Sequence, residues 1–389
     1  MKFPNCLFAV TSRNLIGAQI NNSRILQKRS PLTTTRMASG TTESKYSGEG
    51  VQTFIADSKN PYPLIDVDCN LLHEDLTSLL QEETSFSNID EHLRILKHPS
   101  TIAANIQSVF SPSSTIEEAE KFHQILLDNK SDIGIRMSVG VHPYHAEEDL
   151  TPDLEQDTKK RVEKLIKNDE GYITCIGEAG LDYSEGFPER KFQLPWFKLQ
   201  LQLSKKYNLP LFIHERLAFE DTIALIDEEF PDAENNDYPP IIIHCFTGTQ
   251  EECKMYVERG YFLSVSGYIL KNGEGPEEVQ ACLRNGIIPL DKLMIETDAP
   301  YMGFNGSRDS YYQVEAAFNE DFQALNGKKR KRLLKGIYPN VPSSLPLVLE
   351  ESVKLINEGR KERGEDEIEI GDAAELFYKI SANFFRFQD

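Results

Sequence analysis

Short apolar runs recur along the chain from residue 63 to residue 300, and a longer amphipathic segment follows most of them. The runs are rich in β-branched residues, which is typical of buried strands. Eight such runs can be distinguished: Leu64–Val67, Thr101–Ile106, Ile135–Val141, Tyr172–Ile176, Leu209–Ile213, Ile241–Ile243, Tyr261–Val265 and Lys292–Ile295. Strands that alternate with helices at roughly 30 residues per unit indicate parallel βαβ construction.

The segments between the runs carry the periodicity of amphipathic helices. Thr115–Lys130 aligns its apolar residues on one stripe, and Thr151-Pro152 combines a capping hydroxyl with a proline at the first helical position. Further helices are predicted over Trp196–Tyr207, Leu217–Glu229, Gln250–Arg259 and Pro276–Arg284. Eight units favour an α/β fold of the closed (β/α)8 TIM-barrel type. The alternative is an open doubly wound sheet, but its Gly-rich phosphate turn has no counterpart here.

The last part of the chain, residues 303–389, is less regular. Helices are predicted near Leu345–Asn357 and Ala373–Phe385, so we expect a C-terminal helical extension that covers the barrel. A basic run, Lys328–Arg332, also lies in this part. Such a run would suit phosphate binding or a nuclear localisation signal, although a solvated charged loop is the commoner outcome.

The first 42 residues differ in composition from the rest of the chain. They carry six basic residues and no Asp or Glu, and they are rich in Ser and Thr from Ser30 onward. This composition is typical of an organellar transit peptide, and it fits equally well a disordered extension before a start at Met37. We therefore expect a leader over residues 1–45, followed by a barrel domain over residues 60–389.

Composition and charge restrict the classes of function. The chain is 39% hydrophobic, enough to bury a full core, and no apolar run approaches the roughly 18 residues of a membrane span. Six scattered cysteines without a C-x-x-C pair indicate an intracellular protein, in a mitochondrion or another organelle if the leader acts, otherwise in the cytoplasm or nucleus. The net charge of −20 argues against an extended nucleic-acid groove. It is compatible with an enzyme that contacts a few phosphates at a strand end.

Side chains that can bind metal or move protons stand directly after the strand runs. The first run leads into Asp66-Val67-Asp68-Cys69-Asn70, and five later runs lead into one such residue each: His142, Glu178, His214, His244 and Asp298. In a parallel barrel the carboxyl ends of all strands face one opening, where active sites form. We therefore expect these distant residues to meet at a single mouth.

Two histidines on successive strands, with a glutamate one strand earlier, indicate a metal site. A single histidine after an apolar strand is more often structural, but imidazole and carboxylate donors together suit Zn²⁺, Mn²⁺ or Mg²⁺. One or two divalent ions are therefore predicted at four residues: Glu178, His214, His244 and Asp298.

The predicted chemistry is metal-assisted hydrolysis. A divalent ion lowers the pKa of bound water from about 15.7 toward roughly 7. Asp298, together with Glu178, is the expected catalytic residue, since its carboxylate can orient that water or take its proton. His142 and Arg216 are expected to hold a phosphate oxygen of the substrate, although a surface position beside the mouth fits Arg216 equally well.

Five ordered motifs between Leu64 and Tyr301 resemble those of the TatD family of metal-dependent deoxyribonucleases, which are built on TIM barrels. They are Gly140-Val141-His142-Pro143, Ile176-Gly177-Glu178-Ala179-Gly180-Leu181-Asp182-Tyr183, Pro210-Leu211-Phe212-Ile213-His214, His244-Cys245-Phe246-Thr247-Gly248 and Ile295-Glu296-Thr297-Asp298-Ala299-Pro300. The resemblance implies a magnesium- or manganese-type nuclease that acts on DNA as a 3′→5′ exonuclease. It also implies that Glu178, His214, His244 and Asp298 are the metal residues, with His142 at the phosphate.

The chain departs from the family pattern in two places. Many members carry a His-x-His pair after the first strand, where this chain has Asp68 and Asn70, which puts full occupancy of a second metal site in doubt. An Arg-Asn-Glu-Pro segment of the family is replaced by Pro339-Asn340-Val341-Pro342. This replacement removes a cation and a carboxylate near the mouth.

Two other functions are consistent with these residues. The metal could serve hydrolysis of another ester or amide bond, such as that of D-aminoacyl-tRNA, because a barrel supports many chemistries. The substitutions at Asp68 and Asn70, together with the negative charge, would also fit a non-catalytic barrel that binds nucleic acid or protein.

Overall fold

The computed structural model describes residues 45–387 apart from residues 47, 82–85, 148 and 232–237. The predicted leader therefore lies outside the described residues, except for residue 45. The compact unit that carries the described elements runs from Glu43 to Asp389.

Eight parallel strands form one sheet in the order of the chain, as predicted. They are β1 (Leu64–Asp66), β2 (Ile106–Ser111), β3 (Gly134–Val139), β4 (Ile173–Asp182), β5 (Leu211–Arg216), β6 (Ile241–Ile243), β7 (Phe262–Val265) and β8 (Leu293–Ile295). Backbone hydrogen bonds join the segments that follow β1 and β8, from Val67 N to Ile295 O (3.4 Å) and from Asp298 N to Asp68 O (2.9 Å). The sheet is thereby drawn together into a barrel at its carboxyl end.

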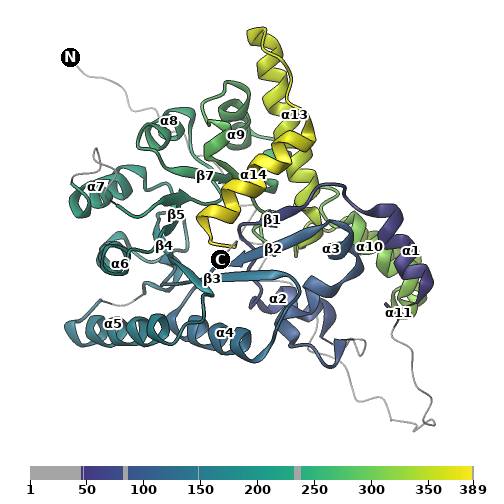
Figure 1. The fold of residues 1–389 in the computed structure, drawn as a ribbon, viewed down its shortest axis with the longest axis horizontal. Coiled ribbons are helices and arrows are strands. Elements are labelled where there is room, and N and C mark those ends of the chain that lie inside the picture. The colour runs from purple at the N-terminus through teal and green to yellow at the C-terminus, as the bar shows by residue number, and fades with distance from the viewer. Residues whose placement is uncertain (1–44, 47, 82–85, 148, 232–237, 388–389) are drawn as a thin grey trace. The chain divides into compact units, whose positions relative to one another are not determined.

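Helices follow the strands and surround the barrel (Figure 1). Those of the repeating units are α4 (Ile116–Asp128), α5 (Pro152–Lys167), α6 (Arg190–Tyr207), α7 (Phe219–Glu229), α8 (Gln250–Glu258) and α9 (Glu274–Arg284). Threonine side chains cap three of them, since Thr115, Thr151 and Thr249 each accept a hydrogen bond from a backbone N–H of the first turn. The hydroxyl and proline expected at Thr151-Pro152 are confirmed as the start of α5.

Of the remaining helices, one precedes β1, two lie between β1 and β2, and the others follow β8. They are α1 (Glu49–Ser58), α2 (Glu74–Thr77), α3 (Pro99–Ala103), α10 (Asp309–Phe318), α11 (Glu320–Ala324), α12 (Gly327–Leu334), α13 (Leu345–Arg363) and α14 (Ile370–Phe384). The C-terminal helical extension is thus confirmed. The basic run Lys328–Arg332 is exposed to solvent, as expected, but it lies on the helix α12 and not in a loop.

Helix α14 closes the amino-terminal opening of the barrel (Figure 1, yellow). Inward-facing side chains of the strands, among them Phe110 and Phe212, form one hydrophobic cluster with the end of α14. The Phe385 ring is fully buried, 4.3 Å from the Phe110 ring and 6.2 Å from the Phe212 ring between centroids. Phe212 also stacks on His244, with ring centroids 4.6 Å apart, so the end of α14, which plugs the barrel, supports a residue at the other opening through Phe212.

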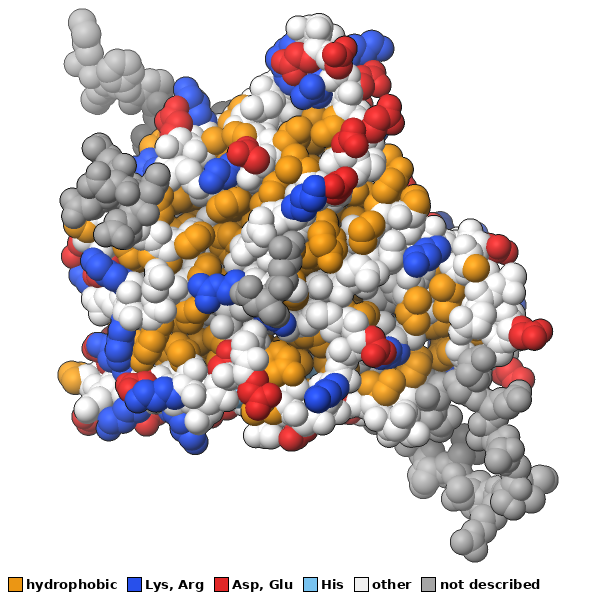
Figure 2. All heavy atoms as spheres, in the orientation of Figure 1, with side chains coloured by type: hydrophobic (Ala, Val, Ile, Leu, Met, Phe, Trp, Pro, Cys, Tyr) orange, Lys and Arg blue, Asp and Glu red, His pale blue; other side chains and the backbone are white. Residues whose placement is uncertain are grey.

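Charged side chains of both signs are interspersed on the face that α14 crosses, with hydrophobic side chains between them (Figure 2). No continuous basic surface covers the described part of this face. A search of the described helices finds none that is long and apolar enough to cross a membrane.

Two local predictions are wrong. Thr101–Ile106 was expected to be a strand, but α3 occupies Pro99–Ala103 and β2 begins only at Ile106. The reason is local: Pro99 stands at the first helical position, and the His98 side chain accepts a hydrogen bond from Ser100 N as an N-cap. Helix α6 begins at Arg190, ahead of the expected Trp196, and accommodates Pro195 within it.

Replacement of Phe385 by alanine should destabilise the barrel by about 3–5 kcal/mol, because a fully buried aromatic ring leaves a cavity under Phe110 and Phe212. Chemical denaturation followed by circular dichroism measures the loss. Leu334→Ala on α12 is the control, since that side chain is 45% exposed and should cost less than about 1 kcal/mol. Equal losses in the two variants would contradict the plug.

Candidate functional site

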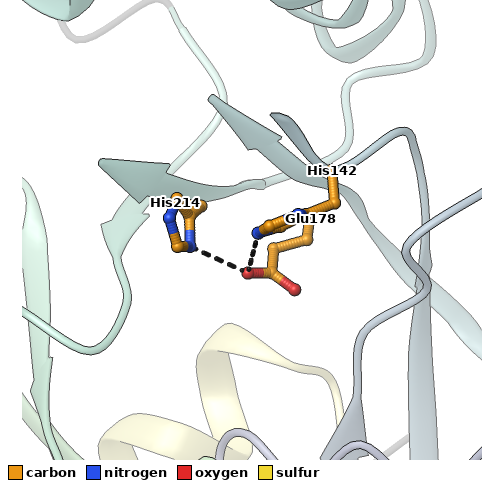
Figure 3. Close-up of side chains that lie close together, drawn as sticks. All are labelled: His142, Glu178 and His214. Carbon is orange, nitrogen blue, oxygen red and sulfur yellow. Dashed lines mark hydrogen bonds and ion pairs between the residues drawn. The ribbon is translucent and has the colours of Figure 1, made fainter. Parts of the chain in front are cut away.

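The carboxylate of Glu178 lies among three imidazoles at the carboxyl end of the barrel, and Figure 3 shows it with two of them, those of His142 and His214. Oε1 of Glu178 lies 3.3 Å from His142 Nε2, 3.1 Å from His214 Nδ1 and 2.8 Å from His244 Nε2. Glu178 belongs to β4, and the histidines follow β3, belong to β5 and follow β6, respectively. Four neighbouring units of the barrel thus contribute to one cluster, as the strand pattern predicted.

A bulge in β4 turns Glu178 toward this cluster. Ile176 pairs with Leu211 and Ala179 with Ile213, so β4 carries one residue more than β5 between these pairs. Glycines permit the close approach of the two strands: a Cβ on Gly180 would lie 1.8 Å from the carbonyl oxygen of His214. The φ of Gly180 is also +145°, in a region that favours glycine.

Two buried glutamines on α6 hold the strand ends that carry site residues. The Gln200 side chain accepts a hydrogen bond from Val141 N (2.8 Å) and donates one to Val141 O (2.9 Å), directly before His142. Gln193 makes the same pair of bonds with the backbone of Asp182, at 2.8 and 2.7 Å. The two residues are seven apart on the helix and therefore lie on one face. Each positions the end of one strand.

Asp182 orients the imidazole of His214. Its Oδ2 lies 2.9 Å from His214 Nε2, on the opposite side of the ring from Glu178. A carboxylate that accepts the proton of one ring nitrogen leaves the other free as a ligand and fixes the orientation of the ring. The arrangement assigns the proton to Nε2 and the donor lone pair to Nδ1.

A second group of donors adjoins the first on the side of β1. Asp68 Oδ2 lies 3.0 Å from His244 Nδ1, and Glu296 Oε1 lies 3.8 Å from the same nitrogen. All three atoms are buried, yet none has a hydrogen bond of good alignment among the described residues. Asp68 and His244 are therefore close enough for an ion pair, but their facing atoms, Oδ2 and Nδ1, are each still able to form a further bond.

Asp298 is connected to this second group through the side-chain amide of Asn70. The Asn70 side chain donates hydrogen bonds to Asp68 Oδ1 (3.2 Å) and to Asp298 Oδ1 (3.3 Å). Asp298 is only 8% exposed, and burial raises its pKa to about 7. Asn70, which stands where many members of the family carry the second histidine of the pair, thus links the two carboxylates.

The electrostatics of the cluster follow from burial and pairing. Burial alone would raise the pKa of Glu178, but the neighbouring imidazoles of His142 and His244 hold it well below its usual range. Burial lowers the pKa of His214, yet hydrogen bonds to Asp182 and Glu178 outweigh it and raise the pKa to about 9. Burial dominates at Asp68, whose pKa lies well above its usual range.

The donor atoms are spaced as ligands of one small cation would be. Two bonds of about 2.0–2.2 Å that meet at about 90–110° place their donor atoms about 2.8–3.6 Å apart. The distances of 2.8–3.3 Å around Glu178 Oε1 fall within this range. Among the described residues, two groups of three have their donor atoms within 4.8 Å of one another, and they share Glu178: His142–Glu178–His214 and Asp68–Glu178–His244. The residues therefore fit one divalent cation, or two that share a carboxylate.

The predicted site residues separate into three sets. Glu178, His214 and His244 come together. Asp298 is connected to this group indirectly, because the side-chain amide of Asn70 donates hydrogen bonds to both Asp298 and Asp68. His142, which was expected at the substrate phosphate, lies among the donor atoms themselves. Arg216 is exposed at the end of β5, and its guanidinium makes no ion pair with any described residue.

Asp182 and Glu296 belong to the site although neither was predicted as a site residue from the sequence. Asp182 lies on the same strand as Glu178, four positions later, and alternation along a strand would have placed both on one face. Glu296 is fully buried and holds Ser264 Oγ at 2.6 Å. Its position two residues before Asp298, directly after β8, was the available signal.

Comparisons with known proteins agree on one family. The sequence profile of a family described as TatD related DNase matches residues 65–361. The 3'-5' ssDNA/RNA exonuclease TatD of Cronobacter sakazakii is 31% identical over 200 residues, which cover 51% of this chain and 69% of that protein. The protein of the same name from Erwinia billingiae is 32% identical over 165 residues, 42% of this chain and 58% of its own length.

Two solved structures share the fold. A hydrolase of the TatD family from Entamoeba histolytica has a TM-score of 0.60 at 22% identity, covering 83% of this chain and 98% of its own. A TatD homolog from Escherichia coli K12 has a TM-score of 0.58 at 19% identity, again covering 83% and 98%. Both similarities extend well beyond the eight strands.

Isothermal titration calorimetry with Mn²⁺ should distinguish the metal ligands from the residues that only orient them. Glu178→Gln should weaken binding by more than about 100-fold, and Asp182→Asn by about 10- to 100-fold, since the latter only orients His214. Glu215→Gln is a matched control. Glu215 is a buried carboxylate next to His214 that bonds to Ala218 N and Tyr256 instead, so its variant should bind as the wild type does. Unchanged binding by a folded Glu178→Gln protein would contradict the assignment.

Proposed function

The chain belongs to the family of TatD related DNases, and from this premise we propose that it is a divalent-metal-dependent deoxyribonuclease that removes nucleotides from the 3′ ends of DNA. Membership of the family makes the protein a hydrolase acting on ester bonds. The metal dependence, the direction of attack and the roles of individual residues form the substance of the proposal.

The observation that carries the proposal is the convergence of three imidazoles on one carboxylate oxygen, Oε1 of Glu178. Glu178, His142, His214 and His244 come from separate strands, and no ordinary structural need places three imidazoles around one buried oxygen. A buried charge is costly unless it is paired or binds a metal. The unused bonding capacity of Asp68, His244 and Glu296 supports the same interpretation.

Each residue would have a defined task. Glu178, His214 and His244 would hold the cation, with His142 or Asp68 completing the donor set. A bound divalent cation would supply electrophilic activation of the phosphate and acidify water. Asp182 would keep the donor nitrogen of His214 directed at the site.

Asp298 would orient the attacking water and take up its proton. Its carboxylate is buried, lies at the carboxyl end of the barrel and is fixed by Asn70 on one oxygen. The backbone hydrogen bond from Asp298 N to Asp68 O holds this segment against the end of β1. General-base action would require the Asp298 carboxylate to lie within hydrogen-bond distance of the water.

Action at a strand end agrees with the distribution of charge. The chain carries a net charge of −20. Tracking of a long duplex would need clustered Lys and Arg. Removal of terminal nucleotides needs few phosphate contacts, and the names of the curated relatives, 3'-5' ssDNA/RNA exonucleases, support this direction.

A 5′-labelled single-stranded oligonucleotide incubated with Mg²⁺ or Mn²⁺ should yield a ladder that shortens one nucleotide at a time, and a chelator should stop it. His244→Ala should lower the rate by at least about 100-fold, because loss of a ligand removes several kcal/mol of transition-state stabilisation. Glu215→Gln, the control used for metal binding, should leave the rate unchanged.

The same assay contains the outcomes that would overturn the proposal. Absence of metal-dependent cleavage, or full activity in His244→Ala, would exclude the proposed centre. Turnover of a D-aminoacyl-tRNA ester but not of DNA would exclude the deoxyribonuclease. It would show instead that the metal centre hydrolyses another ester bond. A fragment pattern with internal cuts would contradict the exonucleolytic direction.

A further inference from the structure

Two aromatic side chains stand at the edge of the metal-site cluster without being part of its coordination. Tyr144 lies on η4 (Pro143–His145), directly after β3, and Phe187 lies in the loop between β4 and α6. Tyr144 is 50% exposed, although a large aromatic ring is more stable when buried. The two rings lie 5.6 Å apart between centroids, at 81° to each other.

Both rings are tied to residues of the site. The Phe187 ring stacks parallel to the His214 imidazole, with centroids 6.3 Å apart and planes 19° apart, and it lies 6.0 Å from the His142 ring. The backbone N–H of Tyr144 donates to His142 Nδ1 at 3.1 Å. The aromatic pair is therefore continuous with the three imidazoles around Glu178, and its position is fixed by the same side chains.

A hollow of about 350 Å³ opens beside this pair. It is lined by Tyr144, Glu147, Gly186, Phe187, Pro188, Glu189 and Phe192. This lining contains three aromatic rings and two carboxylates, and it contains no Lys or Arg. A phosphate would be repelled there, whereas a flat, uncharged ring with N–H donors would find both stacking surfaces and acceptors.

We propose that Tyr144 and Phe187 form a stacking platform for the base of the terminal nucleotide, so that this hollow is a nucleobase subsite of the enzyme. The inference rests on the proposed nuclease function and extends it to the substrate class. A base held beside His142 and His214 places the phosphodiester on its other side over the Glu178 cluster. Stacking on a protein ring requires an unpaired base, so the subsite selects single-stranded ends.

Fluorescence of 2-aminopurine tests the platform without requiring cleavage, because the fluorescence of this base falls when it stacks. The probe is a single-stranded oligonucleotide with 2-aminopurine at its 3′ end and phosphorothioate terminal linkages, titrated in Ca²⁺. The wild type should quench the probe, and Tyr144→Leu and Phe187→Leu should each bind it about 5- to 150-fold more weakly, the range found for loss of one base stack. Tyr144→Phe and Phe187→Tyr keep the rings and should restore binding.

Cleavage of a matched substrate with an abasic 3′-terminal nucleotide gives the second readout. In the wild type the intact end should be preferred over the abasic end through a lower KM, and the two leucine variants should lose that preference. A variant that only disturbed His142 or His214 would slow both substrates equally and keep the ratio. Tyr378→Leu on α14, at the far opening of the barrel, is the control aromatic and should change neither readout.

The two proposals fail in distinguishable ways. DNA cleavage by a wild type that neither quenches the probe nor discriminates against the abasic end would overturn the platform and leave the nuclease intact. Quenching that depends on Tyr144 and Phe187, in a protein that cleaves no DNA, would support the subsite and overturn the nuclease. Quenching that persists in both leucine variants would place the base elsewhere.

Discussion

Buried carboxyl groups are concentrated at one end of the barrel, and the site is organised around the cost of ionising them there. Four of the carboxylates there are at most 6% exposed: Asp68, Glu178, Asp182 and Glu296. Buried charge costs several kcal/mol unless it is compensated. Protonated imidazoles of His214 and His244 compensate part of the negative charge, because the neighbouring carboxylates raise the pKa of both histidines despite their burial. A divalent cation among the same donors would replace these protons, which is why the cluster suits a metal.

The fold supplies rigidity where this balance needs it. The donors lie on or directly after strands, the β4 bulge turns Glu178 inward, and buried glutamines of α6 hold the ends of β3 and β4. From below, Phe212 stacks on His244 and rests in turn on the α14 plug. Loops carry the parts that would meet substrate, including Tyr144 and Phe187. This division between rigid strands and substrate-facing loops is general among barrel enzymes.

Much of the fold and the centre of the site could be predicted from the sequence, because strand ends carry their information locally. His214 and His244 each follow an apolar run, and the parallel barrel then requires them to meet. What could not be predicted depended on contacts across the barrel: that His142 points at Glu178, that Asp182 supports His214, and that Asn70 joins Asp68 to Asp298. The error at Thr101–Ile106 arose because β-branched residues suggested a strand where Pro99 and a His98 cap start a helix. Arg216 was expected at the substrate, and its role there stays a prediction.

The departure from the family's His-x-His pattern acquires a physical meaning in this arrangement. Asp68 pairs with His244 and Asn70 bridges two carboxylates, so the replaced positions remain part of the polar network. The most direct test of the account is a crystal structure with Mn²⁺, in which anomalous scattering locates the ion independently of any assay. The account predicts an anomalous peak about 2.0–2.3 Å from Glu178 and from nitrogen atoms of His214 and His244. A well-ordered site without a peak, with the Glu178–His244 ion pair intact, would contradict it.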